Sequence, residues 1–145
     1  MRNRQKGFTL LELLIVVAII MILATFAVPY AVKQRIQANQ ASAVNDLRVL
    51  RDAMEAYRAD HNRYPASFDR NTMGAFLSNP NMAVSPFTRR GYIFNISTAG
   101  RDTWHATAEP ASPRSGGTRY YFVDESNLLR WNDGAAATAT SEPIE

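Results

Sequence analysis

The fold is decided by residues 6–29, which read KGFTLLELLIVVAIIMILATFAVP. Between Phe8 and Val28 the only ionisable side chain is that of Glu12, and there is no glycine or proline. At a helical rise of about 1.5 Å per residue, this run spans roughly 30 Å, the thickness of the hydrocarbon core of a bilayer. We therefore predict that residues 8–30 form a membrane-spanning helix with one carboxylate near its N-terminal end.

The carboxylate of Glu12 needs a partner in this setting. A carboxylate at mid-membrane costs about 2.5 to 3.5 kcal/mol on insertion scales, and somewhat less near a helix end. The nearest cationic side chains are those of Lys6 upstream and Lys33 downstream. If the chain were cut between Gly7 and Phe8, the new α-amino group would lie one helical turn before Glu12, at the spacing where side groups meet. The amine of a neighbouring copy would serve equally well.

Residues 6–16, KGFTLLELLIV, resemble the class III signal of type IV pilins and of the pseudopilins of type II secretion. The resemblance implies that residues 1–7 are a leader, that a prepilin peptidase cuts after Gly7, and that the new N-terminal residue Phe8 is N-methylated. It also implies that Glu12 guides docking onto a growing filament. Pro29 matches the place where many pilin helices kink.

An ordinary secretory signal is the alternative interpretation of this segment. A basic start precedes an apolar core, and Thr25-Phe26-Ala27 is an acceptable small-x-small cleavage site. However, the apolar run is longer than the usual core of about 7 to 15 residues, it contains Glu12, and an amphipathic helix follows it. These three observations favour the prepilin interpretation.

Charge and cysteine content exclude several kinds of partner and site. The formal net charge is +3, but three of the 16 basic side chains lie in the leader, so its removal leaves 13 basic and 13 acidic side chains. The basic character is therefore largely a property of the precursor and is poor evidence for a nucleic-acid partner. Cysteine is absent, which excludes disulfides and thiolate metal sites. The sheet edge that many related pilins close with a disulfide must be held here by packing alone.

A second, amphipathic helix is predicted over residues 31–60, at the start of a pilin-like globular domain that covers residues 31–134. It should end near Asn62, which tolerates left-handed geometry, and before Pro65, which prevents continuation. One face carries an apolar stripe at alternating three- and four-residue steps. Its members are Ile36, Ala43, Leu47, Leu50, Met54 and Tyr57.

The rest of the domain is predicted to be an antiparallel sheet over about residues 92–131. A variable connection with one short helix, about 69–77, comes first. Strands are expected at 92–96, 103–108, 119–123 and 128–131, because these segments are rich in aromatic and branched residues and are separated by turns. Trp104, Ala106 and Ala108 alternate with polar neighbours and should face the helix stripe. The fold class is therefore α+β and pilin-like, with a loosely attached tail at 135–145.

Candidate chemistry outside the N-terminal segment is sparse. His61 and His105 have no ligand spacing that would join them in a zinc site, and no serine has a nearby histidine arrangement that would make it a nucleophile, so we expect no enzyme. Asp124, Glu125 and Asp133 are weak calcium candidates, because the major pseudopilins that this chain resembles bind calcium near their C-terminus.

A DNA-binding minor pilin is a lower alternative. It would use Arg89, Arg90, Arg101, Arg114 and Arg119, with Tyr92 and Tyr120 close by.

The predicted function is mechanical: a type IV pilin-like subunit that polymerises into a helical filament, with the major pseudopilin of a type II secretion system as the alternative. The resemblance implies that its partners are copies of itself, a prepilin peptidase, an assembly platform driven by an ATPase, and the lipid bilayer before assembly. It implies a single-pass protein of the inner membrane that later joins a periplasmic or extracellular filament. Nucleic acid is not an expected partner.

Overall fold

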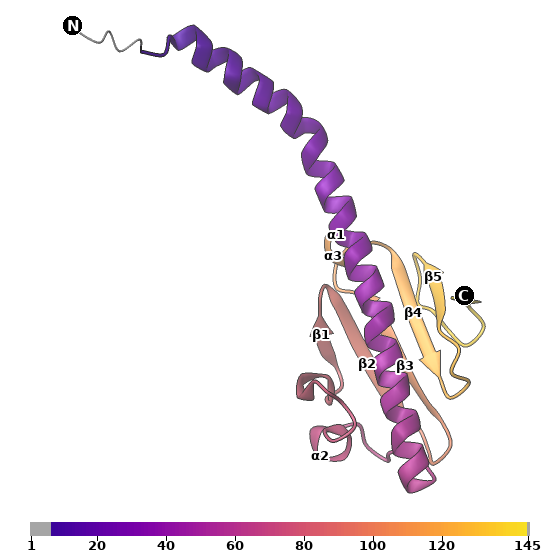
Figure 1. Ribbon diagram of the computed structural model, residues 1–145. Coiled ribbons are helices and arrows are strands. Elements are labelled where there is room, and N and C mark those ends of the chain that lie inside the picture. Colours follow the sequence, from indigo (N-terminus) through magenta and orange to yellow (C-terminus); the bar gives the residue numbers. More distant parts are fainter. Residues whose placement is uncertain (1–6, 145) are drawn as a thin grey trace, which may run out of the picture. The chain divides into compact units, whose positions relative to one another are not determined.

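The computed structural model describes residues 7–144 and divides the chain into two compact units, Met1–Gln34 and Arg35–Glu145. Helix α1 (Leu10–His61) contributes its first part to the N-terminal unit and its remainder to the globular unit (Figure 1). The globular unit also holds the short helices α2 (Arg70–Met73) and α3 (Pro113–Gly116) and the 3-10 turn η1 (Pro80–Met82). The predicted leader lies outside the described residues except for Gly7.

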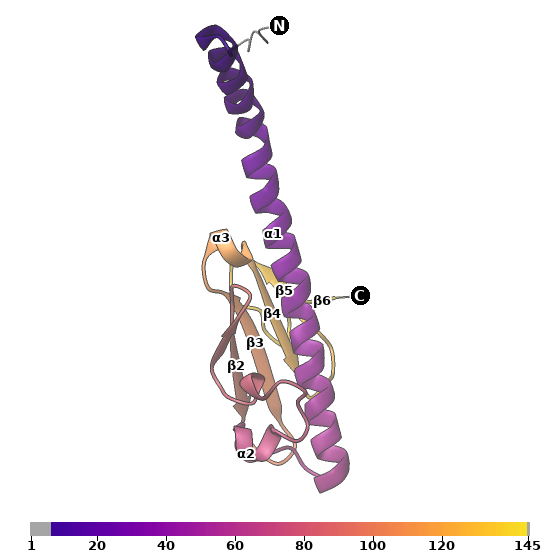
Figure 2. The ribbon, with the colours of Figure 1, turned by 60° about the vertical axis from the view of Figure 1, so that its left-hand side comes forward.

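A six-stranded antiparallel sheet follows the helix in the globular unit, and its strand order is the order of the sequence (Figure 2). Every strand therefore pairs with its sequence neighbour, as expected for short connections. The strands are β1 (Phe87–Arg89), β2 (Tyr92–Thr98), β3 (Trp104–Pro110), β4 (Arg119–Asp124), β5 (Arg130–Asp133) and β6 (Glu142–Pro143). The predicted α+β fold, a helix on a small antiparallel sheet, is confirmed.

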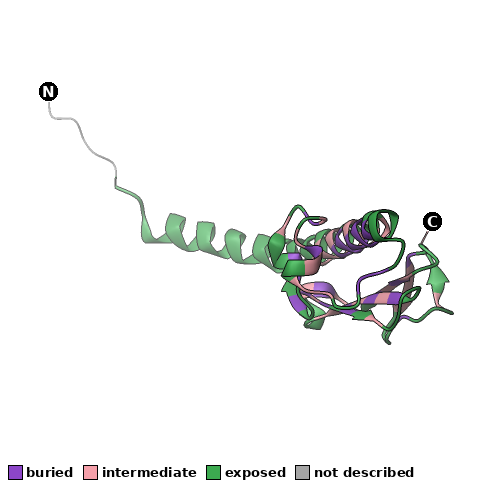
Figure 3. Ribbon diagram, turned by 90° about the horizontal axis from the view of Figure 1, so that it is seen from below, coloured by how far each residue is buried: buried purple, intermediate pink, exposed green. Residues whose placement is uncertain are grey.

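The core of the globular unit lies between one face of α1 and the sheet, and Figure 3 shows buried residues on both. The helix contributes Ala43, Leu47, Leu50, Ala53, Met54 and Tyr57, all of them buried. Trp104, Ala106 and Ala108 are buried on β3, while His105 and Thr107 are only half-buried. The period-two pattern therefore predicted correctly which side of β3 faces the helix.

Helix α1 ends at His61, as predicted, because the next residue takes a left-handed conformation. Asn62 has φ 52°, and its amide donates to the carbonyl of Arg58 at 2.8 Å. This is the αL arrangement that commonly ends helices. The predicted short helix after this point is shorter than expected: α2 covers four residues and follows the cap residue Asp69, whose side chain accepts from the amides of Asn71 and Thr72.

Two edge strands were not predicted, and the C-terminal tail was predicted wrongly. Strand β1 is only three residues long, and its Phe87 stacks on Phe94 of β2 with ring centroids 4.6 Å apart. Residues 135–145 were expected to be loosely attached, but β6 pairs with β5 and Ala137 is buried. Short segments with few apolar residues carry almost no local strand signal, so only pairing with a neighbouring strand reveals them.

Candidate assembly site

Thr9 and Glu12 form a reciprocal capping box at the start of α1. The Thr9 amide and hydroxyl donate to Oε2 of Glu12 at 2.9 and 3.0 Å, and the Glu12 amide donates to Oγ1 of Thr9 at 3.2 Å. Such a box satisfies amides at a helix N-terminus that have no partner within the helix. It also supplies donors to a carboxylate in the apolar segment. The sequence prediction included Glu12 but overlooked Thr9, although the Thr-x-x-Glu spacing was a sufficient signal.

The proposed cleavage position lies just before this capping box and is exposed. Gly7 and Phe8 precede the helix, and the Phe8 side chain is 84% exposed. No atom lies within 4 Å of a Cβ built on Gly7. The Gly7–Phe8 peptide bond is therefore free of steric cover from the described part of the chain, as a processing site requires.

The first part of α1 presents apolar side chains around its whole circumference. It is long and apolar enough to cross a membrane, and none of its most apolar window is buried. The hydroxyl of Thr25 donates to the carbonyl of Met21 at 3.0 Å, so this polar group is satisfied within the helix. Pro29 lies inside α1 and has no amide to donate to the carbonyl of Thr25. A kink at Pro29 stays a prediction.

The three calcium candidates do not form one site. Asp124 and Asp133 lie at opposite ends of β4, because Asp133 pairs with Arg119 and β4 ends at Asp124. Five residues of strand separate these ends by about 17 Å, whereas oxygens that bind one calcium ion lie within about 2.6 Å of it. Within residues 7–144, no three His, Cys, Asp or Glu side chains come together as a metal site. Asp124 and Asp133 are therefore too far apart to bind the same calcium ion.

Each of these carboxylates already has a hydrogen-bonding role in the sheet. Oδ1 of Asp124 accepts from the amide of Ser126 at 3.0 Å and closes the turn between β4 and β5. Oε2 of Glu125 accepts from the Trp104 amide at 3.3 Å, and Asp133 accepts from the Thr118 hydroxyl. The carboxylate oxygens at the β4–β5 turn are therefore already used as hydrogen-bond acceptors, and they do not form the ligand set of a calcium-binding loop.

The arginines considered for DNA binding do not all lie at one end of the sheet. Arg89 faces inward and lies 3.2 Å from Oδ1 of the buried Asp46, while Arg90 donates to the Ser42 hydroxyl at 2.7 Å. Arg101 precedes β3 and Arg114 follows it, so the seven residues of that strand separate them by roughly 20 Å. Arg101 therefore lies apart from Arg114, and Arg89 is held by a buried carboxylate rather than free to contact a nucleic-acid backbone.

Asp46 is a buried charge that the sequence analysis missed. It is 5% exposed, and burial raises the pKa of its carboxyl above the usual range, although Arg89 and Arg90 oppose the rise. Oδ2 of Asp46 has no partner among the described residues. A signal was available in the sequence, because Asp46 is three residues after Ala43 and four before Leu50, which places it on the buried face of the helix.

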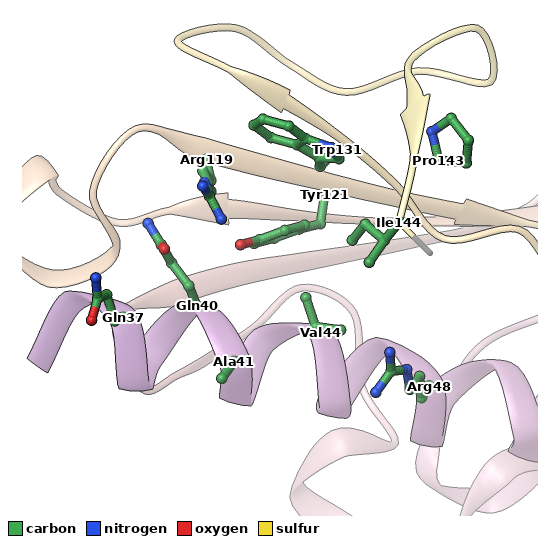
Figure 4. Close-up of a pocket in the computed structure, with 10 residues that line it drawn as sticks. All are labelled: Gln37, Gln40, Ala41, Val44, Arg48, Arg119, Tyr121, Trp131, Pro143 and Ile144. Carbon is green, nitrogen blue, oxygen red and sulfur yellow. The ribbon is translucent and has the colours of Figure 1, made fainter. Parts of the chain in front are cut away.

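A groove of about 610 Å³ separates part of α1 from β4, β5 and β6 (Figure 4). Its helix wall is formed by Gln37, Gln40, Ala41, Val44 and Arg48, and its sheet wall by Arg119, Tyr121, Trp131, Pro143 and Ile144. Arg119 covers the ring of Trp131 at 4.8 Å from the centroid. Neither wall carries an acidic residue or a nucleophile with an adjacent base.

The exposed apolar helix start, its capping box and the helix-backed antiparallel sheet define the class of pilin-like proteins that carry a prepilin signal. Comparison with family models agrees: residues 2–28 match the prokaryotic N-terminal methylation motif, and residues 31–120 match type II secretion system protein G. The chain belongs to the type II secretion system protein G family. The predicted membership of the pilin and pseudopilin group is thereby confirmed, and single-pass membrane anchoring is indicated by the same helix and motif.

Several curated relatives carry the name type II secretion system core protein G. The protein of Dickeya chrysanthemi is 32% identical over 147 residues and covers 94% of this chain and 93% of its own length. That of Vibrio cholerae is 33% identical, with 93% and 90% covered, and that of Aeromonas hydrophila is 35% identical, with 77% and 76% covered. Among solved structures, the non-core minor pilin PilV of Neisseria meningitidis matches with a TM-score of 0.43 and 14% identity, covering 71% of this chain and 93% of that one.

These relatives change the order of the two predicted subclasses. The sequence predicts a type IV pilin first, with a major pseudopilin as the alternative. The family match and the names of the relatives favour the pseudopilin. Nothing in this family assignment supports catalysis.

Proposed function

We propose that this chain is the major subunit of a pseudopilus in a type II secretion system. It is made as a precursor, held in the inner membrane by residues 8–30, cut after Gly7, methylated on Phe8 and polymerised with copies of itself into a periplasmic filament. The observation that carries the proposal is the placement of Glu12: a carboxylate in an exposed apolar helix, one turn after the cleavage position, in a chain of the protein G family.

In the membrane stage, the capping box reduces the cost of the buried carboxylate. Thr9 supplies two donors to Glu12, so the charge does not enter the apolar region without hydrogen bonds. Cleavage after Gly7 then creates a cationic amine on Phe8, close to the same carboxylate. In the monomer the Glu12 carboxylate therefore stays hydrogen-bonded to Thr9 until a cationic amine is available as a stronger partner.

In the assembly stage, the exposed apolar side chains of α1 are removed from lipid by packing against the same helix of neighbouring copies. Glu12 pairs with the Phe8 amine of an adjacent subunit or with its own. Within such a filament core the dielectric is low, so leaving either charge unpaired costs several kcal/mol. The charge pair thus selects the axial position at which the helices pack, and packing supplies most of the association energy.

The partners that this function requires are a prepilin peptidase, a membrane assembly platform driven by an ATPase, and further copies of the chain. No step uses a cofactor or nucleic acid. A surface type IV pilus is the competing function, and the location of the filament separates the two. Chains recovered from sheared surface filaments would favour the pilus, whereas chains retained in the periplasm together with a secretion defect on deletion would favour the pseudopilus.

The testing experiment compares Glu12→Ala with the wild type in native membranes. The variant should insert normally, because the apolar run drives insertion, and it should lose filament assembly, because assembly needs the carboxylate as the partner of an amine. Normal filaments from this variant would refute the assignment. The intact mass and N-terminal residue of the wild-type protein supply the second readout. A chain that starts at methylated Phe8 supports prepilin processing, while a chain that starts after Ala27 indicates an ordinary secreted protein.

A further inference from the structure

The C-terminal segment closes on the sheet through its own backbone. After β5, Gly134 turns the chain with φ 76°, and its amide donates to the carbonyl of Thr118 at 2.7 Å. The chain then returns as β6, which pairs with Arg130 and Trp131 of β5. The amide of Ile144 adds a further bond to the carbonyl of Leu129 at 2.8 Å. We call residues 134–144 the C-terminal clasp.

Side chains hold the C-terminal clasp in place as well. Nη1 of Arg130 donates to the carbonyl of Ser141 at 3.1 Å, across the start of β6. Ser141 and Thr138 exchange hydrogen bonds of 2.9 and 3.0 Å, which close a tight turn before that strand. Ala137 is buried, and Ile144 packs against the hydrophobic core. The last described residue of the chain is therefore also a core contact.

The adjacent β4–β5 turn is likewise complete without an ion. The Asn127 amide donates to the carbonyl of Asp124 at 3.0 Å, and Asn127 takes the left-handed conformation with φ 63°. The side chains of Asp124 and Glu125 accept from Ser126 and from the start of β3, as described above. Calcium takes six to eight oxygen ligands, and the third acidic candidate, Asp133, lies at the far end of β4.

We propose that the C-terminal clasp holds this end of the sheet in place of the calcium ion that the resemblance to major pseudopilins implied. The globular unit of this chain then folds and keeps its stability without calcium, because strand pairing and the packing of the half-buried Ile144 against the core perform the closure. This proposal concerns the fold of the monomer. Its test does not depend on which filament the chain builds.

The test is the thermal unfolding of the full-length protein in detergent micelles, followed by tryptophan fluorescence, in EGTA and in millimolar calcium chloride. The described tryptophans, Trp104 and Trp131, both lie in the sheet and report on the globular unit. A calcium site filled at about a hundred times its Kd would raise the Tm by roughly 10 °C. We expect the two curves to coincide. A calcium-dependent rise of several degrees that disappears in Asp124→Asn would overturn the proposal.

Two variants test the C-terminal clasp itself under the same conditions. Ile144→Asp places a carboxylate against the core and should lower the Tm by roughly 5 °C or more, with or without calcium. Ala139→Asp adds the same charge to an exposed position of the same segment and should leave the Tm nearly unchanged. Equal Tm values for Ile144→Asp, Ala139→Asp and the wild type would show that the segment closes nothing and would refute the proposal.

Discussion

Thr9 and Glu12 hydrogen-bond to each other in both directions, with two bonds from Thr9 to the Glu12 carboxylate and one from the Glu12 amide back to the Thr9 hydroxyl. One polar pair thus caps the helix and satisfies the only carboxylate in the apolar segment. The same carboxylate is the group that must pair with an amine during assembly. The capping box therefore links helix stability to the proposed assembly step.

The Thr9→Val variant tests that link. It keeps the shape of the side chain but removes two of the three hydrogen bonds, which should cost the helix start about 1 kcal/mol and leave Glu12 poorly satisfied in the membrane. We expect normal membrane levels and a several-fold lower filament yield, measured as the ratio of assembled to membrane-bound chain. Thr25→Val is the matched control, because it removes a hydroxyl that bonds only within the same helix. If both variants assembled equally well, Thr9 would have no role in assembly.

The buried Asp46 should give the stability of the globular unit a recognisable pH dependence. Burial raises the pKa of the Asp46 carboxyl in the folded state, against the opposing effect of Arg89 and Arg90. A group whose folded pKa is raised stabilises the fold below its unfolded pKa, about 3.9, and that contribution is lost as the pH rises through the raised value. Near neutral pH the charged carboxylate therefore destabilises the folded state, and the ion pair with Arg89 only partly offsets this cost.

The Asp46→Asn variant makes this testable. Relative to the wild type, it should gain stability as the pH rises from about 4 through the raised pKa of the Asp46 carboxyl, and the gain should then level off, because the amide has no charge to bury. The measurement is the Tm of both proteins at a series of pH values, followed by tryptophan fluorescence. Asp52→Asn, at an exposed position that pairs with Arg51, is the control, and its Tm should vary with pH in the same way as that of the wild type. A constant offset between Asp46→Asn and the wild type at every pH would contradict the prediction.

Gly116 is required by close packing where α3 meets the sheet. A Cβ at this position would lie 2.7 Å from Cβ of Pro110 and 2.9 Å from the ring of Tyr92, whose hydroxyl donates to the Gly116 carbonyl at 2.7 Å. Gly116→Ala should therefore lower the free energy of unfolding by about 1 to 3 kcal/mol. Gly100→Ala is the matched control, since its added Cβ meets nothing closer than 3.5 Å. Equal unfolding midpoints for the two variants would show that this site relaxes without cost.

The hydroxyl of Tyr64 ties the end of α1 to the loop that follows it. It donates to Glu55 at 2.6 Å and accepts from Arg58 at 3.1 Å, while the ring is almost fully buried. Tyr64→Phe leaves the ring in place and should lower stability by about 1 to 2 kcal/mol, because two charged groups lose a partner. Tyr120→Phe, on a half-buried residue of β4, should change the unfolding midpoint far less. If Tyr64→Phe left the stability unchanged, water would have replaced the hydroxyl as the partner of Glu55 and Arg58.

Local patterns in the sequence predicted the elements that are defined by their own residues. The unbroken apolar run predicted the membrane helix, Asn62 and Pro65 predicted the end of α1, and alternation in Trp104, Ala106 and Ala108 predicted the buried face of β3. Each of these signals is a hydrophobic pattern or a helix-ending residue that can be recognised within a segment of about ten residues. The subclass could not be chosen in this way, because pilins and pseudopilins share the N-terminal signal on which the prediction depended.

By itself, the sequence determined the membrane segment, the position of Glu12 on it, and the order of a long helix followed by a sheet. These follow from hydrophobicity and spacing along one stretch of chain, which need no other element to take effect. The tertiary structure alone decided that the C-terminal tail returns as β6, that Asp46 faces Arg89, and that Asp124 and Asp133 lie at opposite ends of one strand. Pairing and burial between distant residues depend on which strands become neighbours, and that is settled only when the chain closes its core.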